Sequence, residues 1–442
     1  MSLRLIYGRA GTGKSNYCFQ EIKENIKAQN KIYIITPEQF SYMAEKKLLE
    51  AIGNQAVINA EVLTFNRMAD RINAEIGGKS EKQITKSSKA MLMFFALKEN
   101  KQDFTFLGNS NESLELAIKG ITEFKKHGIK VKDIDKNLEN IEDINLKLKL
   151  QDMKKIYLEY ENKLQNEYID EDDKLTKLAK NLEKSKMFDN SYIYIDEFAG
   201  FTHQEYDIIR SLMKKAKKMT ITSCIDSEEV FANIKLETSI FSPNKKVLDK
   251  IIRIAEEEKI KIENPVILEN TYRFKNEELK HLEQNIYANS YKKYSKNPEN
   301  IKLFLAANPY SEIEHVAKQI IKLVRDEGYK YRDISIITKN IENIESIAKA
   351  VFNKYGIPIY IDGKDELSQN IGVKYVLAIL EIYAKNWSAE SVLSYIKLGF
   401  CNIEKQEIYI IENYIKKWGI RGLKKYKEEW KLGEDNEELE QI

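Results

Sequence analysis

Cysteine and arginine are scarce in this sequence, and long apolar runs are absent. The three cysteines, Cys18, Cys224 and Cys401, lie too far apart for the paired spacing of a metal site, and their separation also disfavours disulfides. No run of about 18 apolar residues and no charged-then-apolar leader is present, so nothing predicts a membrane span or export. We therefore expect a cytoplasmic protein that makes no membrane contact.

An excess of charge of one sign is missing as well. The 71 basic residues are almost cancelled by 69 acidic ones, and the net charge of +2 gives no argument for nucleic-acid binding. Only ten of the basic residues are arginines, and lysines spread along helices usually form a solvated face. An arginine inside a motif is therefore informative. The length of 442 residues exceeds what one core supports, and roughly two to four domains are expected.

The first fifteen residues are the most informative segment. An apolar stretch over residues 3–7 runs directly into a complete Walker A loop, Gly8-Arg9-Ala10-Gly11-Thr12-Gly13-Lys14-Ser15. The glycines let successive backbone N–H groups point inward around a β-phosphate. Lys14 offers a cation to the phosphate oxygens, Ser15 offers a hydroxyl to Mg²⁺, and residues 16–27 predict a helix whose positive end faces the phosphates. We therefore expect the whole loop to bind ATP with Mg²⁺.

Two further short apolar stretches predict parallel strands. Residues 31–36 end in Pro37-Glu38-Gln39-Phe40, and residues 57–63 open into a helical pattern from Thr64. Loops at the carboxyl ends of parallel strands are where such sheets bind ligands, and we count Gln39 among the expected nucleotide contacts. From about residue 77 to 188 the sequence changes to long Lys/Glu-rich amphipathic helices with no convincing strand. We interpret this region as an inserted helical domain.

The strand pattern returns at residues 191–195 and ends in two acids, Asp196 and Glu197. An apolar strand with an acidic tip, downstream of a Walker A loop, is typical of a Walker B motif. Asp196 is suited to hold Mg²⁺, and Glu197 is suited to orient or deprotonate the attacking water. Lys14 and Glu197 are therefore the expected catalytic residues, and Ser15 and Asp196 are the expected metal ligands.

The rest of the chain predicts two more strands and then a second α/β unit. Strands are expected at residues 219–224 and 265–268. Arg273 follows them and is the only arginine in its neighbourhood; it is suited to reach a γ-phosphate, while a surface arginine at a helix start explains the pattern equally well. The expected elements of the second unit are strands at 301–306, 334–338 and 357–361, helices at 311–327 and 343–355, and helices again from 373.

Three features have plain structural explanations. Consecutive acids at 170–173 cannot all face one ion, and they are better explained as the cap of a helix. His203 has no visible catalytic partner and predicts a surface or turn position. The 25 tyrosines are spread over strands and helices alike, which favours packing over stacking on single-stranded bases.

The order of these motifs resembles superfamily 1 helicases of the UvrD/RecB kind, with Tyr272-Arg273 and residues 331–337 in the later positions. The opening Walker loop, Thr36-Pro37-Glu38-Gln39-Phe40-Ser41 and Val62-Leu63-Thr64-Phe65-Asn66-Arg67 more closely resemble the B subunits of AddAB helicase–nucleases. The resemblance implies an α/β fold of P-loop, RecA-like parallel sheet domains with a large helical insertion. The implied domains are a first RecA-like domain (1A) at 1–76 plus 189–270, a helical insertion (1B) at 77–188, a second RecA-like domain (2A) at 271–385, and the start of a helical 2B-like region at 386–442.

Departures from active motors of this superfamily are informative. Only seven residues precede Gly8, so the upstream glutamine that holds adenine is missing. Ala199 and Gly200 stand where motors carry Gln and Asp, although Gln204 keeps a later position. The segment 223–226 replaces a phosphate-sensing glutamine, and the last arginine-bearing motif lies beyond residue 442 if present. We therefore expect nucleotide binding without translocation.

For the whole protein, the resemblance implies a role in double-strand break repair. The family pairs with an AddA-like motor and nuclease subunit, acts on single- and double-stranded DNA, and scans for a recombination hotspot. Longer members continue into a nuclease domain with an iron–sulfur cluster, whose cysteine ligands have no counterpart here, so this chain is expected to be an N-terminal part. Two other classes stay open: a self-sufficient P-loop ATPase, DNA motor or nucleotide kinase, and a non-catalytic DNA-binding scaffold with a relic P-loop. The arginine-poor stretch 77–188 argues against a kinase lid.

Overall fold

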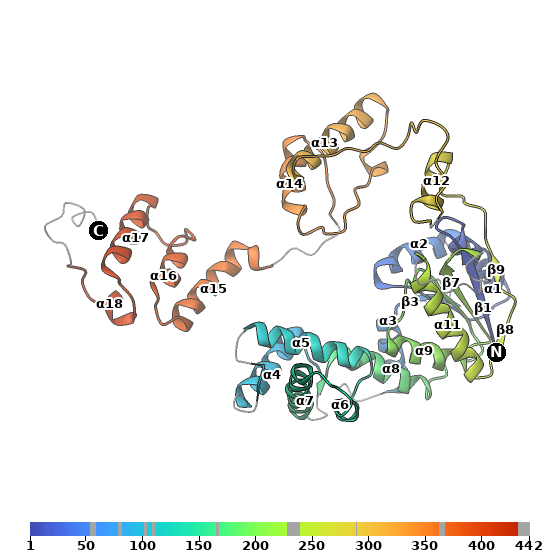
Figure 1. Ribbon diagram of the computed structural model, residues 1–442, viewed down its shortest axis with the longest axis horizontal. Coiled ribbons are helices and arrows are strands. Elements are labelled where there is room, and N and C mark those ends of the chain that lie inside the picture. Colours follow the sequence, from blue (N-terminus) through green and yellow to red (C-terminus); the bar gives the residue numbers. More distant parts are fainter. Residues whose placement is uncertain are drawn as a thin grey trace. The chain divides into compact units, whose positions relative to one another are not determined.

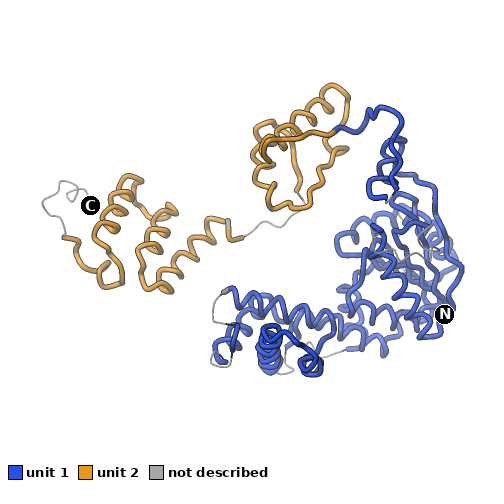
Figure 2. Tube along the Cα trace, in the orientation of Figure 1, with its two compact units in different colours: residues 1–302 blue, residues 303–442 orange. Residues whose placement is uncertain are grey.

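The chain forms two compact units, unit 1 over Met1–Lys302 and unit 2 over Leu303–Ile442 (Figure 1, Figure 2). No helix in the described part of the chain is long and apolar enough to cross a membrane. The computed structural model describes residues 1–53, 59–77, 82–100, 104–107, 111–164, 168–227, 239–288, 290–361 and 367–431.

Unit 1 is built on a parallel sheet with the strand order β3-β2-β6-β7-β1-β8, and β9 pairs with β1 as well. Its central strands are near-continuous apolar runs because both faces of a parallel sheet are covered. The strands are β1 (Ser2–Gly8), β2 (Ile32–Ile35), β3 (Ala60–Leu63), β6 (Tyr192–Ile195), β7 (Lys218–Cys224), β8 (Lys261–Ile262) and β9 (Val266–Ile267).

Helices cover both faces of this sheet, which makes three layers (Figure 1). Successive residues of β1 point to opposite faces, so Leu5 joins one core and Ile6 the other. The Ile6 side is covered by α1 (Lys14–Lys27) and α2 (Ser41–Ile52). The Leu5 side is covered by α3 (Phe65–Ile76), α8 (Lys174–Leu182), α9 (His203–Met213) and α11 (Ser242–Glu257). The expected P-loop α/β fold is confirmed.

The helices between β3 and β6 form a core of their own. They are α4 (Lys86–Glu99), α5 (Asn111–Lys126), α6 (Val131–Leu138) and α7 (Ile144–Leu164). The expectation of no strand in this region is wrong, because β4 (Lys82–Gln83) and β5 (Tyr168–Ile169) pair in parallel. Two residues are too few to show strand periodicity in a sequence.

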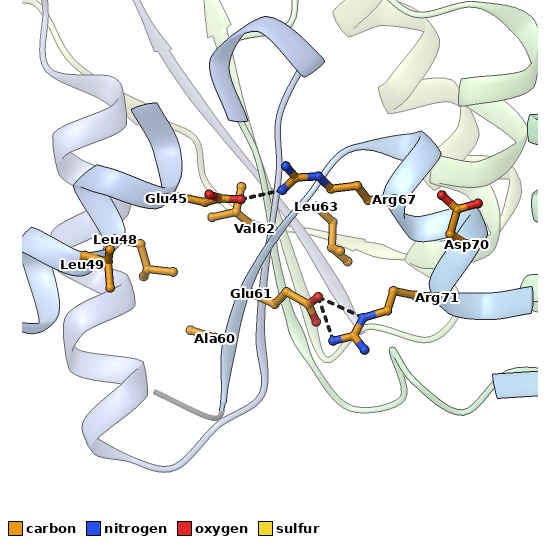
Figure 3. A pocket seen from close by; sticks show the side chains of 10 residues that line it. All are labelled: Glu45, Leu48, Leu49, Ala60, Glu61, Val62, Leu63, Arg67, Asp70 and Arg71. Atoms are coloured by element: carbon orange, nitrogen blue, oxygen red, sulfur yellow. Dashed lines mark hydrogen bonds and ion pairs between the residues drawn. The ribbon is translucent and has the colours of Figure 1, made fainter. Parts of the chain in front are cut away.

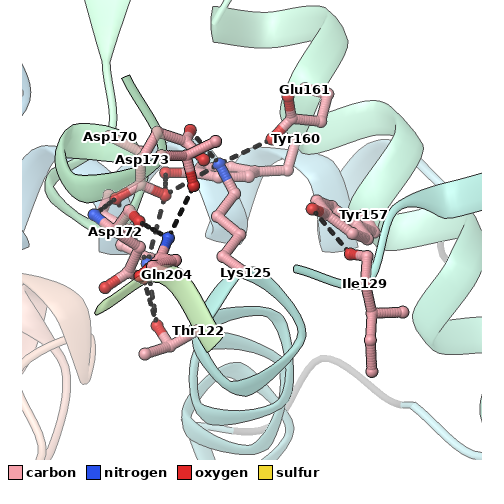
Figure 4. Close-up of polar contacts among 12 residues, drawn as sticks. Thr122, Lys125, Ile129, Tyr157, Tyr160, Glu161, Asp170, Asp172, Asp173 and Gln204 are labelled. Carbon is pink, nitrogen blue, oxygen red and sulfur yellow. Dashed lines mark hydrogen bonds and ion pairs between the residues drawn. The ribbon is translucent and has the colours of Figure 1, made fainter. Parts of the chain in front are cut away.

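Buried charges connect this helical insertion to the sheet domain (Figure 4). Asp170 caps the 3₁₀ turn Glu171–Asp173 by accepting the N–H of Asp172, which confirms the expected cap. Its carboxylate also accepts the hydroxyl of Tyr160 at 2.8 Å and pairs with Lys89 and Lys125 at 3.3 and 3.2 Å. Gln204 of α9 donates to the backbone oxygen of Asp172 at 2.7 Å. The acidic run is therefore a structural joint between α9 and the insertion.

Unit 2 contains helices but no assigned strand among its described residues. Its helices are α13 (Pro309–Asp326), α14 (Glu345–Lys354), α15 (Ile371–Ala384), α16 (Ala389–Ile396), α17 (Lys405–Trp418) and α18 (Leu423–Lys427). The expected helices at 311–327 and 343–355 are confirmed as α13 and α14.

The expected strands at 301–306, 334–338 and 357–361 are wrong: these segments form no ladder. Ile334 and Ile357 pack against α13 and α14, while Leu303 and Leu305 are almost fully exposed. A short parallel pairing is marginal unless both faces are covered, and here one side lacks cover. Residues 271–302, which the sequence assigned to the second domain, belong to unit 1.

Candidate nucleotide-binding site

The Walker A segment forms the turn between β1 and α1. Gly11 and Gly13 have φ angles of 79° and 82°, in the left-handed region that favours glycine. Gly13 is the N-terminal cap of α1, and its carbonyl accepts the N–H of Tyr17 at 2.9 Å. The N-terminal N–H groups and positive end of α1 therefore face the loop, as phosphate binding requires.

Lys14 is held inside this loop. Its Nζ donates to the carbonyl oxygens of Gly8 at 2.8 Å and Arg9 at 2.9 Å. These neutral acceptors leave the positive charge of the ammonium uncompensated. Phosphate oxygens would be stronger partners for it.

The acid pair after β6 lies next to Ser15. The hydroxyl of Ser15 donates to Glu197 Oε1 at 3.1 Å. Asp196 is 8% exposed, and its Oδ1 accepts the hydroxyl of Thr222 on β7 and the N–H of Glu197. Glu197 has φ 68°, an uncommon conformation for a residue with a side chain and one that often marks functional sites.

Residues 268–273 form a strap that crosses the Walker loop. The N–H of Leu268 donates to the carbonyl of Tyr7 at 2.9 Å, and the N–H of Tyr272 donates to the carbonyl of Gly11 at 2.8 Å. A Cβ on Gly11 would lie 2.5 Å from the Cβ of Arg273, so the strap requires glycine there. This contact brings Arg273 to the phosphate loop.

One cavity of about 550 Å³ joins these parts. It contains the expected residues Ala10, Gly11, Gly13, Lys14, Ser15, Asp196, Glu197 and Arg273. It also contains eight residues that were not among the expected site residues: Asn16, Lys47, Phe198, Ala199, Thr222, Cys224, Asn244 and Tyr272. Lys47 lies in the middle of α2, where a lysine has no motif to mark it. Thr222 and Asn244 belong to no recognisable motif either, because they reach the cavity from two elements, β7 and α11, that are separate in the sequence.

Four expected nucleotide contacts, Gly8, Arg9, Thr12 and Gln39, are not among the residues that line the cavity. The hydroxyl of Thr12 donates to the carbonyl oxygen of Arg9 at 3.0 Å, and the carbonyl oxygen of Gly8 accepts the Nζ of Lys14. The guanidinium of Arg9 turns to Asp226 and to Glu283 of α12 (Glu277–Asn285), so only its backbone contributes to the loop. Gln39 is exposed on the 3₁₀ turn Glu38–Phe40 and is not among the cavity-lining residues.

The donor set fits Mg²⁺. Ser15 and Asp196 present a hydroxyl and a carboxylate in one cavity, and Mg²⁺ takes oxygen ligands with the remainder from phosphate and water. No cluster of three or more His, Cys, Asp or Glu side chains placed to hold a metal occurs among the described residues. Cys18, Cys224 and Cys401 are free thiols.

A second hollow of about 600 Å³ lies beside the edge strand β3 (Figure 3). Arg67 pairs with Glu45 of α2, and Arg71 pairs with Glu61 at 2.9 Å. Nearby, Glu38 accepts the hydroxyl of Thr64 at 3.1 Å and the amide of Asn66 at 2.8 Å, which ties the loops after β2 and β3 together.

The parallel sheet, the phosphate loop and the acid pair define a P-loop protein of the superfamily 1 helicase-like class. Comparison with known proteins is more specific. The family described as "ADDB, N-terminal" matches residues 5–283, and the family described as "UvrD-like helicase C-terminal domain" matches residues 263–435. The chain belongs to the AddB N-terminal family.

Curated relatives agree with this assignment. The chain is 44% identical over 436 residues to the B subunit of the ATP-dependent helicase/deoxyribonuclease of Clostridium tetani, which covers 96% of this chain and 38% of the relative. It is 38% identical over 444 residues to the same subunit of Clostridium novyi, which covers 99% of this chain and 39% of the relative. The corresponding subunit of Caldanaerobacter subterraneus is 39% identical over 438 residues, which covers 97% of this chain and 37% of the relative. The chain thus spans less than two fifths of the length of these relatives.

Proposed function

We propose that this chain binds Mg²⁺-ATP and forms the helicase-like part of the B subunit of an ATP-dependent helicase/deoxyribonuclease. One observation carries the proposal: Lys14, Ser15, Asp196, Glu197 and Arg273, which come from separate segments of the chain, line a single cavity. A P-loop that had lost its function would have no need to keep the acid pair and the arginine beside it.

Each of these side chains has a chemical role in this proposal. Lys14 and the N–H groups of the loop hold the β- and γ-phosphates, and Arg273 neutralises charge on the γ-phosphate. Ser15 and Asp196 hold Mg²⁺, and Glu197 orients the attacking water. Tyr272 is 72% exposed at the edge of the cavity, and its ring offers a stacking surface for the base.

We expect hydrolysis to be slow and the site to be regulatory. Thr222, Cys224 and Asn244 occupy the β7 side of the cavity, where the sequence has no phosphate-sensing glutamine. Ala199 stands where motors carry a coupling side chain. We therefore expect ATP binding to be kept while tight coupling to DNA movement is lost.

The biological role we propose is the processing of double-strand DNA breaks for recombinational repair in the cytoplasm. The partner is an AddA-like motor and nuclease subunit, since the relatives are named as one subunit of a helicase/deoxyribonuclease. We assign the nuclease site and the iron–sulfur cluster to a longer protein of this family, and recognition of a hotspot sequence to the helicase-like part. Within this proposal residues 1–76 and 189–270 act as domain 1A, 77–188 as 1B, 271–385 as 2A and 386–442 as the start of 2B. The first part of the proposed 2A, residues 271–302, packs in unit 1.

Single-stranded DNA is the proposed ligand of the loops after β2 and β3. Gln39 is exposed there, and the aromatic residues Phe40 and Tyr42 beside it are 36% and 72% exposed. Exposed aromatic rings next to hydrogen-bonding side chains suit stacking on unpaired bases.

The test is calorimetric titration of Mg²⁺-ATP into the chain and into Lys14→Ala, with ATP hydrolysis followed with and without single-stranded DNA. We expect binding by the wild type, loss of at least about 100-fold in affinity in Lys14→Ala, and little DNA-stimulated hydrolysis. Vigorous stimulated turnover would identify an active motor instead. Equal ATP affinity in both proteins would leave only the DNA-binding scaffold.

A further inference from the structure

Arg9 is the one charged residue of the Walker loop besides Lys14, and it is not among the residues that line the cavity. Its Nε donates to both carboxylate oxygens of Glu283 at 3.1 Å, and its Nη2 donates to the backbone oxygen of Glu283 at 2.9 Å. Its Nη1 donates to Asp226 Oδ2 at 2.8 Å. All three guanidinium nitrogens are therefore engaged by α12 and by the loop after β7.

The surroundings of Arg9 favour a fixed ion pair over a mobile one. The side chains of Arg9, Asp226 and Glu283 are 21%, 24% and 18% exposed, and the guanidinium carbon lies 5.1 Å from the ring centre of Phe241. Burial opposes the charge of Arg9, but hydrogen bonds to Asp226 and Glu283 outweigh it and raise the pKa of the guanidinium. Arginine pairs of this kind also fix direction, because the planar fork accepts only one geometry.

The helix that Arg9 holds is the continuation of the strap. The strap is attached at its start to Tyr7 of β1 by Leu268 and near its end to the Walker loop by Tyr272, and α12 begins four residues after Arg273. The Arg9–Glu283 contact gives the strap a further fixed point, beyond Tyr272, on its α12 side. Glu278 of α12 in turn accepts the N–H groups of Glu299 and Asn300 at 2.9 and 2.8 Å, so the helix is braced at both ends.

We propose that Arg9 is a positioning residue: by bridging Asp226 and Glu283 it holds α12, so that the strap keeps Arg273 directed at the γ-phosphate of a bound nucleoside triphosphate. The proposal rests on the proposed function, since it assumes that the cavity binds ATP. It assigns to the guanidinium of Arg9 a role in selecting the triphosphate over the diphosphate, exerted through Arg273 and without contact to the nucleotide.

The experiment measures affinities of Mg²⁺-ATP and Mg²⁺-ADP for the full chain by calorimetry. The variants are Glu283→Gln, which keeps shape and removes charge, Arg9→Lys, which keeps charge and loses the fork, Arg273→Ala, and the double variant of Glu283→Gln with Arg273→Ala. Glu258→Gln is the matched control, because Glu258 pairs with Arg210 at 2.7 Å between α9 and α11 and does not line the cavity. Thermal unfolding confirms that each variant is folded at the temperature of the titration.

We expect Glu283→Gln and Arg9→Lys to weaken ATP binding about tenfold with little change for ADP, as Arg273→Ala does. The double variant should bind ATP no more weakly than Arg273→Ala alone, because both changes remove the same contact. Glu258→Gln should keep the wild-type ratio of the two affinities.

Equal losses for ATP and ADP in the Glu283 and Arg9 variants, or losses that add to that of Arg273→Ala, would overturn the positioning role and leave the proposed function standing. Equal ATP affinity in wild type and Lys14→Ala would overturn both the positioning role of Arg9 and the proposed function. If Glu283→Gln does not fold, the ATP and ADP affinities of Arg9→Lys decide between these outcomes.

Discussion

At the scale of single residues, Gly11 is required by two separate constraints. Its φ of 79° disfavours any side chain, and the strap approaches so closely that a Cβ would meet Arg273 at 2.5 Å. Gly53, which ends α2, has a similar φ of 74°, but a Cβ added there would meet nothing within 4 Å. A comparison of alanine variants at these two positions therefore distinguishes the effect of backbone strain from the effect of crowding.

Gly11→Ala and Gly53→Ala should each lower the free energy of unfolding by roughly 1–2 kcal/mol through the strained backbone. Only Gly11→Ala should also weaken ATP binding, by about tenfold or more, because the strap must move. Urea unfolding and calorimetry measure the two effects. Unchanged ATP affinity in Gly11→Ala would show that the strap does not matter for binding.

Thr222 holds Asp196, the carboxylate that we propose as a Mg²⁺ ligand. Its hydroxyl donates to Asp196 from the neighbouring strand. Thr222→Val keeps the shape and removes the donor, and we expect the Mg²⁺ concentration for half-maximal ATP binding to rise about tenfold, as for other residues behind a metal ligand. Thr222→Ser, which keeps the hydroxyl donor, should have a Mg²⁺ dependence close to that of the wild type. A wild-type Mg²⁺ dependence in the valine variant would contradict this role.

At the scale of elements, a buried ion pair attaches α1 to the sheet. Arg4 of β1 is 7% exposed, and it donates to Glu21 of α1 with both terminal nitrogens and to Thr220 of β7 at 3.3 Å. Burial opposes the charge of Arg4, but the hydrogen bond from its guanidinium to Glu21 and the charge of Glu21 outweigh it and raise the pKa. The helix that carries Lys14 is thus fixed in direction by a charge contact as well as by apolar packing.

Arg4→Met should lower the free energy of unfolding by about 2–4 kcal/mol, because it leaves the Glu21 carboxylate half-buried without its arginine partner. The double variant with Glu21→Leu should recover most of that loss. Urea unfolding followed by circular dichroism measures both. If the double variant were as unstable as the sum of the two single ones, the pair would not be interacting.

The stability of the helical insertion should depend on pH through the carboxylate of Asp170. Burial alone would raise the pKa of Asp170, but the charges of Lys125 and Lys89 and the hydroxyl of Tyr160 outweigh burial and hold that pKa below its usual value. A carboxylate with a lowered pKa in the folded state stabilises above its unfolded pKa of about 3.9, and that stabilisation is lost as the pH falls through the folded value.

Asp170→Asn should therefore destabilise the chain by about 2–3 kcal/mol at neutral pH, and the difference from wild type should narrow below about pH 4. Asp189→Asn is the control, because Asp189 is half exposed and pairs with Lys215 at the surface. Urea unfolding at pH 7, 5, 4 and 3 gives the comparison. If the free energies of unfolding of wild type and Asp170→Asn differed by the same amount at every pH, the charge of Asp170 would not contribute to stability.

At the scale of the whole molecule, the cavity that we propose binds ATP lies within unit 1. Every residue that lines it lies between Ala10 and Arg273, and α12 is part of the same unit. Unit 2 has separate cores around α13 with α14 and around α16 with α17.

We expect a chain of residues 1–302 to bind Mg²⁺-ATP with an affinity within about threefold of the full chain, since no cavity residue is lost. Calorimetry on both chains makes the comparison. A 1–302 chain that folds, as judged by its thermal transition, but does not bind ATP would show that unit 2 contributes to the site.

Much of this protein follows from local sequence. The Walker loop, the acid pair and the helices α1, α13 and α14 are encoded in short segments, because turn geometry, caps and apolar periodicity depend on near neighbours along the chain. Both RecA-type landmarks of unit 1 are predicted in this way, together with the helical nature of the insertion.

Tertiary structure decided what local sequence cannot carry. The guanidinium of Arg9 binds Glu283, which is 274 residues away, and does not line the cavity. Thr222, Lys47 and Tyr272 enter the cavity from three separate parts of the chain. The strand-like segments of unit 2 form no sheet, because strand pairing depends on neighbours and cover that lie elsewhere. Sequence alone determined which backbone segments make a phosphate loop, since that is a matter of a few dihedral angles. Only the fold decided which side chains meet there, since those contacts join residues that no local pattern relates.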